Sequence, residues 1–271
     1  MISLIPIHDE NPTRRAAVVT YALIAINVVV FLLEPASHAL ISQPSSPADQ
    51  CHELAFFYRW AAIPIELTSN HQLARVPGPP AGASQCLAVP PGYDKVPALS
   101  VLSAMFLHGG WLHLLGNMLF LWVFGNNVED RLGRVRYLLF YLVCGYVATY
   151  GFALTQPNSR ETLVGASGAI AGVLGAYIVL YPRARVTSLI PFLFFLPAQF
   201  PAWIVLGSWF VLQWLYFQGA GLAEGSNVAY FAHVAGFVAG VVLIIVLGGL
   251  SRARRPPPSW PPPSPRWDRY G

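Results

Sequence analysis

The sequence predicts an all-α membrane protein with six transmembrane helices, and three observations support this fold class. Hydrophobic residues make up 55% of the 271 residues and charged residues only 10%, whereas a soluble domain carries roughly a quarter charged residues. The chain also contains six apolar runs of about 18 to 22 residues, each long enough to cross a hydrocarbon core of about 30 Å as a helix. These runs are continuously apolar rather than alternating, which favours helices over spanning strands. They cover residues 16–33, about 106–125, 137–155, 164–181, 202–219 and 228–249.

The distribution of arginine and lysine predicts the orientation. With the amino terminus inside, only Arg59, Arg75, Lys95 and Arg160 of the 16 basic residues fall outside the cell. The positive-inside rule therefore places both termini in the cytoplasm. The net charge of +4 follows from this topology and gives no support to nucleic-acid binding. We expect a multi-pass protein of the plasma membrane, because no transit peptide precedes the first run and no cleavage site for a signal peptidase follows it.

The predicted organisation is a cytoplasmic leader, a six-span domain and a proline-rich disordered cytoplasmic tail, at residues 1–15, 16–250 and 251–271. A long external loop of about residues 34–100 is expected between the first and second helices. The prolines of segment 182–201 predict an interfacial connection rather than a helix. Cys51 and Cys86 both fall in the external loop, where a disulfide could persist, so a bridge between them is a hypothesis.

A serine and a histidine interrupt two of the apolar runs. Ser167 lies in Gly165-Ala-Ser-Gly168 at the start of the fourth run, and His233 lies just inside the sixth. Both helices enter from the outer face, so a rise of about 1.5 Å per residue puts both side chains roughly 5 to 8 Å below that face. Histidine is the base that titrates nearest to neutral pH, and a base is what a serine hydroxyl needs to become a nucleophile. The pair predicts Ser167 as the nucleophile and His233 as its general base.

The second run supplies two further polar side chains, His113 and Asn117, which are four residues apart and so share a helix face. Their N–H groups are suitable donors for the oxyanion that acyl transfer creates. Like the serine and the histidine, they lie in the outer half of an even-numbered run. No acid accompanies them, because Glu129 and Asp130 follow Asn117 by about twelve residues, roughly 18 Å along a helix. The residues therefore predict a Ser–His dyad rather than a triad.

Glycines recur at helical spacing beside both catalytic candidates. Gly168 and Gly172 lie on one face of the fourth run, and Gly236 and Gly240 lie on one face of the sixth. Small residues let two helices approach closely. We therefore expect these two faces to pack together, which would bring a short serine side chain to an imidazole ring.

At these residues the chain resembles the rhomboid family of intramembrane serine proteases, over about residues 100–245. The resemblance rests on Gly165-Ala-Ser167-Gly168, Ala232-His233-Val-Ala-Gly236, His108-Gly-Gly-Trp-Leu-His113-Leu-Leu-Gly-Asn117 and Glu129-Asp-Arg131-Leu-Gly133. It implies a six-helix rhomboid-like bundle with Ser167 as nucleophile, His233 as base, and His113 and Asn117 at the oxyanion. In one departure, the position four residues after the serine, which is aromatic in some members, is Ala171 here. His233 would thereby lose a stacking partner.

The sequence therefore predicts a serine endopeptidase that cleaves transmembrane or juxtamembrane segments of single-span membrane proteins in the lipid bilayer. The expected hydrolysis needs no cofactor and no metal ion. Two alternatives stay open: a catalytically inactive rhomboid-like protein that binds membrane clients, and a transporter. A zinc protease with the His-Glu-x-x-His motif is excluded, because the residue four after His52 is Phe56. The sequence predicts neither the natural substrate nor the oligomeric state.

Overall fold

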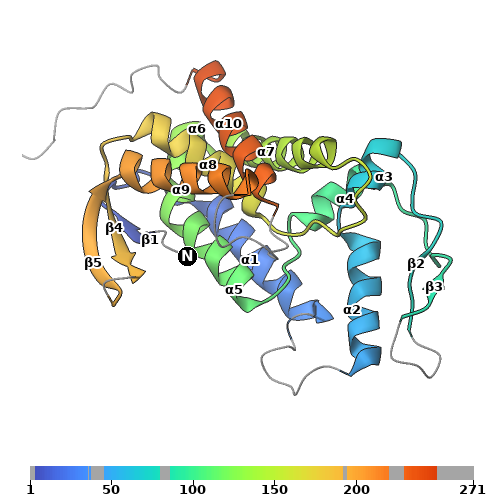
Figure 1. The fold of residues 1–271 in the computed structure, drawn as a ribbon. Coiled ribbons are helices and arrows are strands. Elements are labelled where there is room, and N and C mark those ends of the chain that lie inside the picture. The colour runs from blue at the N-terminus through green and yellow to red at the C-terminus, as the bar shows by residue number, and fades with distance from the viewer. Residues whose placement is uncertain are drawn as a thin grey trace, which may run out of the picture.

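The computed structural model describes residues 4–35, 37, 46–79, 86–191, 194–219 and 229–248, and most of them are helical (Figure 1). A π-helical segment, η2 (Leu121–Gly125), joins α5 (Trp111–Phe120) to α6 (Asn126–Leu132) without a break. The α-helices of these residues are α1 (Val18–Leu33), α2 (Pro47–Trp60), α3 (Pro64–Ser69), α4 (Pro97–Ala104), α5 (Trp111–Phe120), α6 (Asn126–Leu132), α7 (Arg134–Thr155), α8 (Ser167–Leu180), α9 (Ala202–Phe217) and α10 (Tyr230–Val246).

Each predicted apolar run contains helical structure, but the helices differ in length. Within the described residues, α7 alone is both long and apolar enough to cross a membrane, by length and composition. Helices α1, α8, α9 and α10 are also apolar and have 14 to 17 residues. The outer faces carry exposed apolar side chains such as Leu33 (79% exposed), Leu154 (73%) and Val246 (74%), a pattern typical of surfaces that contact lipid or another protein. The number of spans stays a prediction.

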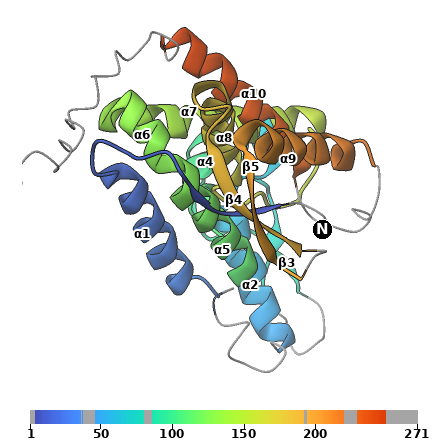
Figure 2. The ribbon, with the colours of Figure 1, turned by 90° about the vertical axis from the view of Figure 1, so that its left-hand side faces the viewer.

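Helix α8 is the central helix of the bundle (Figure 2). Every residue from 169 to 177 is buried, as expected for a helix that is apolar on all sides. The helix packs most closely against α10. A Cβ atom added to Gly236 would overlap the carbonyl oxygen of Gly168, and one added to Gly240 would overlap that of Gly172. The predicted packing of the two glycine faces is confirmed.

Helix α1 begins without a side-chain cap of its own, and Glu129 of α6 supplies the missing acceptor. The Glu129 carboxylate accepts the backbone N–H groups of Val19 (2.9 Å) and Thr20 (2.7 Å), and also the Thr20 hydroxyl (2.8 Å). An anionic acceptor satisfies the free N–H groups at a helix start and interacts favourably with the helix dipole. The hydrogen bonds to Glu129 therefore connect the start of α1 to α6.

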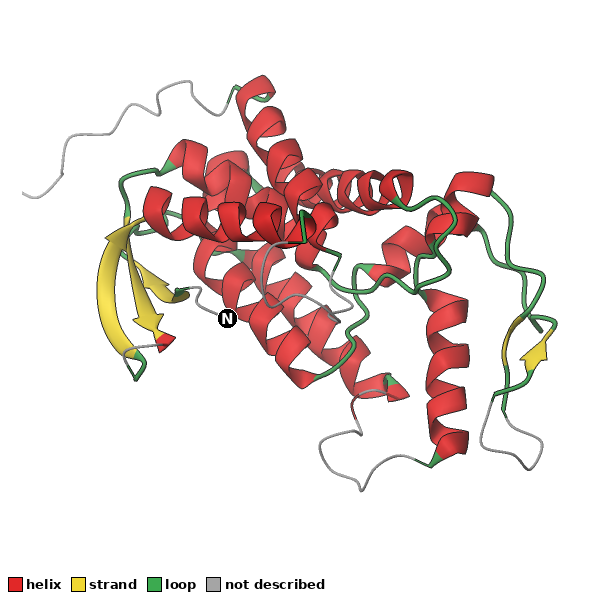
Figure 3. Cartoon of the chain, in the orientation of Figure 1, coloured by secondary structure: helices red, strands yellow, loops and turns green. Residues whose placement is uncertain are grey.

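The all-α prediction is wrong at one end of the molecule, where three strands form an antiparallel sheet in the order β1–β4–β5 (Figure 3). These strands are β1 (Ile5–Asp9), β4 (Arg185–Ile190) and β5 (Leu196–Pro201). The sequence predicts no strand in the leader or in segment 182–201, where prolines indicate an irregular connection. In the sheet, however, Pro6, Pro197 and Pro201 lie on the two edge strands, and proline is tolerated at sheet edges because an edge N–H can stay unpaired.

Hydrogen bonds to the Asp9 side chain connect this sheet to helices α6 and α8. Its Oδ2 atom accepts hydrogen bonds from the Tyr177 hydroxyl of α8 (2.7 Å) and from the Asn127 amide of α6 (2.8 Å). Burial raises the pKa of the Asp9 carboxyl above its ordinary value, and the hydrogen bond from Tyr177 opposes that shift. Strand β1 of the predicted leader is therefore hydrogen-bonded to the helical bundle through Asp9. The predicted disordered tail, residues 251–271, lies outside the described residues.

The predicted external loop is a folded insertion in its described residues. It contains α2, α3 and a hairpin of β2 (Val76–Pro77) with β3 (Ala88–Val89), and Figure 1 shows it at the opposite end of the molecule from the β1–β4–β5 sheet. A disulfide joins Cys51 of α2 to Cys86, with Cα atoms 5.5 Å apart. The hypothesis of this bridge is confirmed. The insertion also contains a buried ion pair between Lys95 and Glu66.

Candidate active site

The structure brings Ser167 and His233 into direct contact. Ser167 is the first residue of α8, and His233 lies one turn into α10. The glycine contacts described above hold these two helices close together. As a result, the Nε2 atom of His233 lies 2.8 Å from the Oγ atom of Ser167, which is the distance of a hydrogen bond through which a proton can pass.

His113 and Asn117 of α5 lie beside Gly165, two residues before the serine. A Cβ atom on Gly165 would lie 2.7 Å from His113 Nε2 and 3.6 Å from Asn117 Nδ2. Gly165 also has a φ of +118°, a conformation that side-chain-bearing residues rarely adopt. Both features require glycine at this position. The backbone just before Ser167 therefore lies next to two potential hydrogen-bond donors, His113 Nε2 and Asn117 Nδ2.

His113 and Asn117 each have a side-chain nitrogen that is free to donate a hydrogen bond to a ligand. The Gly109 N–H donates a long hydrogen bond (3.4 Å) to His113 Nδ1, so a neutral His113 ring carries its proton on Nε2, the atom that faces Gly165. The Nδ2 amide nitrogen of Asn117 is buried and has no hydrogen-bond partner in the described residues. Because a buried donor without a partner is costly, this atom is available for a ligand oxygen.

Helix α9 supplies two residues that the sequence reasoning missed. Gln213 Oε1 lies 2.7 Å from His233 Nδ1, and the Trp209 ring lies with its centroid 5.9 Å from that of the His233 ring. Polar groups of the site are thus not confined to even-numbered runs, since Gln213 belongs to the fifth. Trp209 therefore provides the aromatic contact with the His233 ring that Ala171 cannot provide. A glutamine within an apolar run was the signal available in the sequence.

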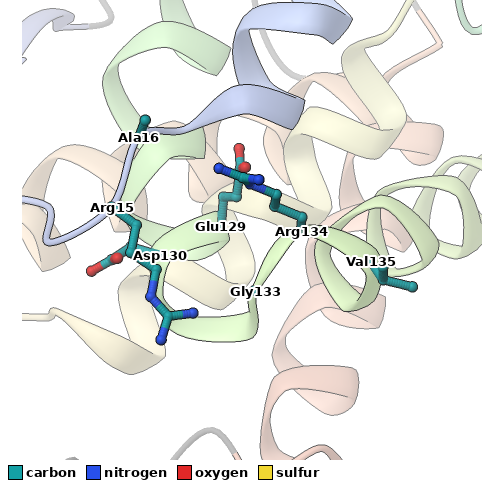
Figure 4. Close-up of a pocket in the computed structure, with 7 residues that line it drawn as sticks. All are labelled: Arg15, Ala16, Glu129, Asp130, Gly133, Arg134 and Val135. Carbon is teal, nitrogen blue, oxygen red and sulfur yellow. The ribbon is translucent and has the colours of Figure 1, made fainter.

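A cavity of about 310 Å³ lies elsewhere, where α6 meets α7 (Figure 4). Its lining includes Glu129, which caps α1, and Arg134, the first residue of α7. Arg134 precedes Ala148, which packs against Gly168, by fourteen residues, or roughly 21 Å along a helix. The cavity is therefore separate from Ser167. Among the described residues, no cluster of three or more His, Cys, Asp or Glu side chains could hold a metal ion.

Comparison with known proteins places this chain among rhomboid proteins. The model of the Rhomboid domain matches residues 97–250, more than half of the chain. The chain is 31% identical over 150 residues to Rhomboid protein 1, mitochondrial, of Saccharomyces cerevisiae, a match that covers 53% of this chain and 40% of the relative. It is 36% identical over 80 residues to Putative rhomboid protease YdcA of Bacillus subtilis, over 30% of this chain and 40% of the relative.

RHOMBOID-like protein 6, mitochondrial, of Arabidopsis thaliana is 30% identical over 154 residues, which cover 54% of this chain and 43% of the relative. The chain thus spans less than half the length of these three relatives. The residues that the Rhomboid model matches, 97–250, include helices α5, α8, α9 and α10, which carry the site residues. The chain belongs to the rhomboid family, whose members are embedded in membranes.

Proposed function

We propose that this protein is an intramembrane serine endopeptidase that uses Ser167 and His233 as a catalytic dyad. The observation that carries the proposal is the 2.8 Å contact between Ser167 Oγ and His233 Nε2. The donors of His113 and Asn117 beside Gly165 support it, because a Ser–His contact with nearby oxyanion donors is the arrangement that acyl transfer needs.

In the acylation step, Ser167 Oγ attacks the carbonyl carbon of the scissile peptide while His233 Nε2 takes the hydroxyl proton. The carbonyl oxygen becomes an oxyanion that accepts hydrogen bonds from Asn117 Nδ2, from His113 Nε2–H and from the Ser167 backbone N–H at the start of α8. The C–N bond then breaks as His233 passes its proton to the leaving amine, which leaves an acyl ester on Ser167. Removing one such oxyanion donor in other enzymes costs about 100- to 1,000-fold in kcat.

In the second step, His233 takes a proton from a water molecule, which attacks the ester carbonyl. The ester C–O bond then breaks as His233 passes the proton to Ser167 Oγ, which releases the new carboxyl terminus and the free serine. The proposed substrates are single-span membrane proteins cut within or beside the transmembrane helix. A peptide in a helix has its carbonyl engaged in a hydrogen bond, so the helix must unwind locally before Ser167 can reach it. Segments with glycine, alanine or proline near the cut are therefore the preferred substrates.

We further propose that six helical segments cross the bilayer, with both termini on the cytoplasmic side and the disulfide-bonded insertion outside. The arginine distribution supports this orientation, and so does the disulfide, which persists in an oxidising compartment. Location in a plasma membrane stays a prediction. Labelling of single added cysteines with a membrane-impermeant maleimide in intact cells tests the orientation: sites in the insertion should react and sites beside Arg14 should not.

Cleavage of a single-span reporter in liposomes tests the activity. The wild-type protein should cut the reporter, while Ser167→Ala and His233→Ala should reduce the rate to background. A fluorophosphonate probe should label the wild type and fail to label Ser167→Ala. Undiminished cleavage by either alanine variant would overturn the dyad. A wild type that binds the reporter but neither cuts it nor reacts with the probe would instead identify an inactive client-binding relative.

A further inference from the structure

The distal nitrogen of the catalytic imidazole has a neutral partner. In a Ser–His–Asp triad, a carboxylate accepts the Nδ1–H and so fixes the tautomer in which Nε2 is free to take the serine proton. Here the atom at hydrogen-bond distance from His233 Nδ1 is the side-chain oxygen Oε1 of Gln213, at 2.7 Å. An amide oxygen can only accept a hydrogen bond. Nδ1 must therefore be the protonated nitrogen, which leaves Nε2 unprotonated toward Ser167.

Helix α9 holds the imidazole at two points. Trp209 and Gln213 are four residues apart and so lie on one face of the helix. Trp209 lies against the His233 ring, with the two ring planes at 34°, and also against Phe237, one turn further along α10. Phe237 in turn contacts Phe210, with ring centroids 4.7 Å apart. The ring contacts limit how the imidazole can tilt, and the hydrogen bond to Gln213 limits how it can rotate.

An amide is better suited to this position than a carboxylate. The contact between Gln213 and His233 is partly buried within the helical bundle, where an ionised side chain loses most of its hydration and pays a large desolvation penalty. A glutamine provides the same acceptor geometry without a charge. It selects the tautomer but gives the imidazolium less electrostatic stabilisation than a carboxylate does.

We propose that Gln213 is the positioning residue of the dyad, which orients His233 and fixes its proton on Nδ1 in place of the acid of a triad. The inference rests on the proposed protease function and names a residue that the dyad description leaves out. Gln213 does not touch the reacting atoms, so it acts only through His233. Its loss should lower kcat and leave KM nearly unchanged, because KM depends on contacts with the substrate.

Kinetics of the full chain in liposomes test this role with three substitutions of Gln213 and one control. Gln213→Ala and Gln213→Asn, whose shorter side chain cannot reach Nδ1, should each lower kcat about 10- to 100-fold, equivalent to the loss of one buried hydrogen bond. Gln213→Glu should retain activity, and the acidic limb of its kcat/KM profile should move to higher pH by about one unit or more, because a carboxylate stabilises the imidazolium. The control is Gln218→Ala, at the exposed end of the same helix, which should match the wild type.

The tautomer can be measured without catalysis. In 15N-histidine NMR spectra of the full chain, the His233 signals, assigned by comparison with His233→Ala, should show a protonated Nδ1 in the wild type and in Ser167→Ala. In Gln213→Ala this preference should be lost. A wild-type His233 protonated on Nε2 would overturn the inference whether or not the protein cuts the reporter. Cleavage that depends on Ser167 but is unchanged in Gln213→Ala would also overturn it, while leaving the proposed function intact.

Discussion

Lys95 and Glu66 form a 2.7 Å ion pair whose side chains are only 4% and 0% exposed. The Lys95 ammonium also donates to the carbonyl oxygens of Tyr58 and Ala61, both at 2.8 Å. Glu66 uses its second oxygen to accept the Leu73 N–H at 2.9 Å. The pair thus joins α3 to the end of α2 and to the segment before α4. Burial lowers the pKa of Lys95, and the contact with Glu66 opposes that shift.

Removing one partner of this pair should destabilise the insertion. Lys95→Met leaves the Glu66 carboxylate buried without a counter-charge, which costs about 3 to 5 kcal/mol in comparable cases. We expect a lower midpoint of thermal unfolding for Lys95→Met in detergent. The double variant Lys95→Met/Glu66→Gln should recover much of the loss, because the amide is neutral and still accepts the Leu73 N–H. Equal destabilisation of the single and double variants would show that lost packing, rather than the unpaired charge, is the cause.

Glu34 should make the stability of the protein depend on pH. Burial, together with the nearby charge of Glu53, raises the pKa of the Glu34 carboxyl from 4.5 to about 7, although the His108 N–H that it accepts opposes the shift. The folded protein therefore binds this proton more tightly than the unfolded chain does. The stability that Glu34 contributes is full below about pH 4.5 and is lost as the pH rises through 7.

Glu34→Gln should remove this dependence, because the amide keeps an acceptor for the His108 N–H but carries no charge. At pH 8 the variant should be more stable than the wild type by up to about 3 kcal/mol, and at pH 4.5 the two should be nearly equal. Thermal unfolding at both pH values measures the difference. Glu161→Gln, at an exposed position, serves as the control and should follow the wild type. A constant offset across the pH range would count against the titration of Glu34.

Gly240→Ala should push α10 away from α8, because the added methyl group would meet the Gly172 carbonyl oxygen. Overpacking of this kind costs about 1 to 3 kcal/mol. Since α8 and α10 carry Ser167 and His233, we expect cleavage of the reporter to fall together with the unfolding midpoint. Gly207→Ala is the matched control, because a Cβ atom there has no neighbour within 4 Å. It should raise stability slightly through helix propensity and leave cleavage unchanged.

Asn117→Ala should lower kcat without loosening the fold. The variant removes the Nδ2 donor, which has no hydrogen-bond partner in the described residues, so the loss of this atom breaks no hydrogen bond there. Loss of one oxyanion donor lowers kcat by about 100- to 1,000-fold. The free energy of unfolding should stay within about 0.5 kcal/mol of the wild-type value. A large fall in the midpoint together with the rate would assign Asn117 a structural role instead.

Sequence reasoning located the residues whose polarity contrasts with their surroundings. Ser167 and His233 stand out because an ionisable or nucleophilic group in an apolar run is costly, and their glycine neighbours predict how closely the helices pack. Gln213 stands out less, because an amide carries no charge and its partner lies on another helix. Only the three-dimensional arrangement shows that it reaches His233.

The sheet and the insertion were harder to predict for a different reason. Pro197 and Pro201 argue against a strand unless the neighbouring strands are known, because only the pairing order shows that they lie at an edge. Strand β4 pairs not only with β5 but also with β1, about 180 residues earlier in the chain, with Ile5 opposite Leu189. The local sequence around β4 does not indicate that it pairs with a strand so far away in the chain.

This pairing has a consequence for the path of the chain through a bilayer. A backbone ladder cannot form between segments on opposite sides of a hydrocarbon layer, so β1 and β4 must lie on the same side of the membrane. For a chain that spans the bilayer as proposed, the number of crossings between Asp9 and Arg185 must therefore be even. Four crossings, by α1, the α5–η2–α6 helix, α7 and α8, satisfy this parity and three or five do not. The pairing of β1 with β4 thus constrains the membrane topology independently of hydropathy and charge.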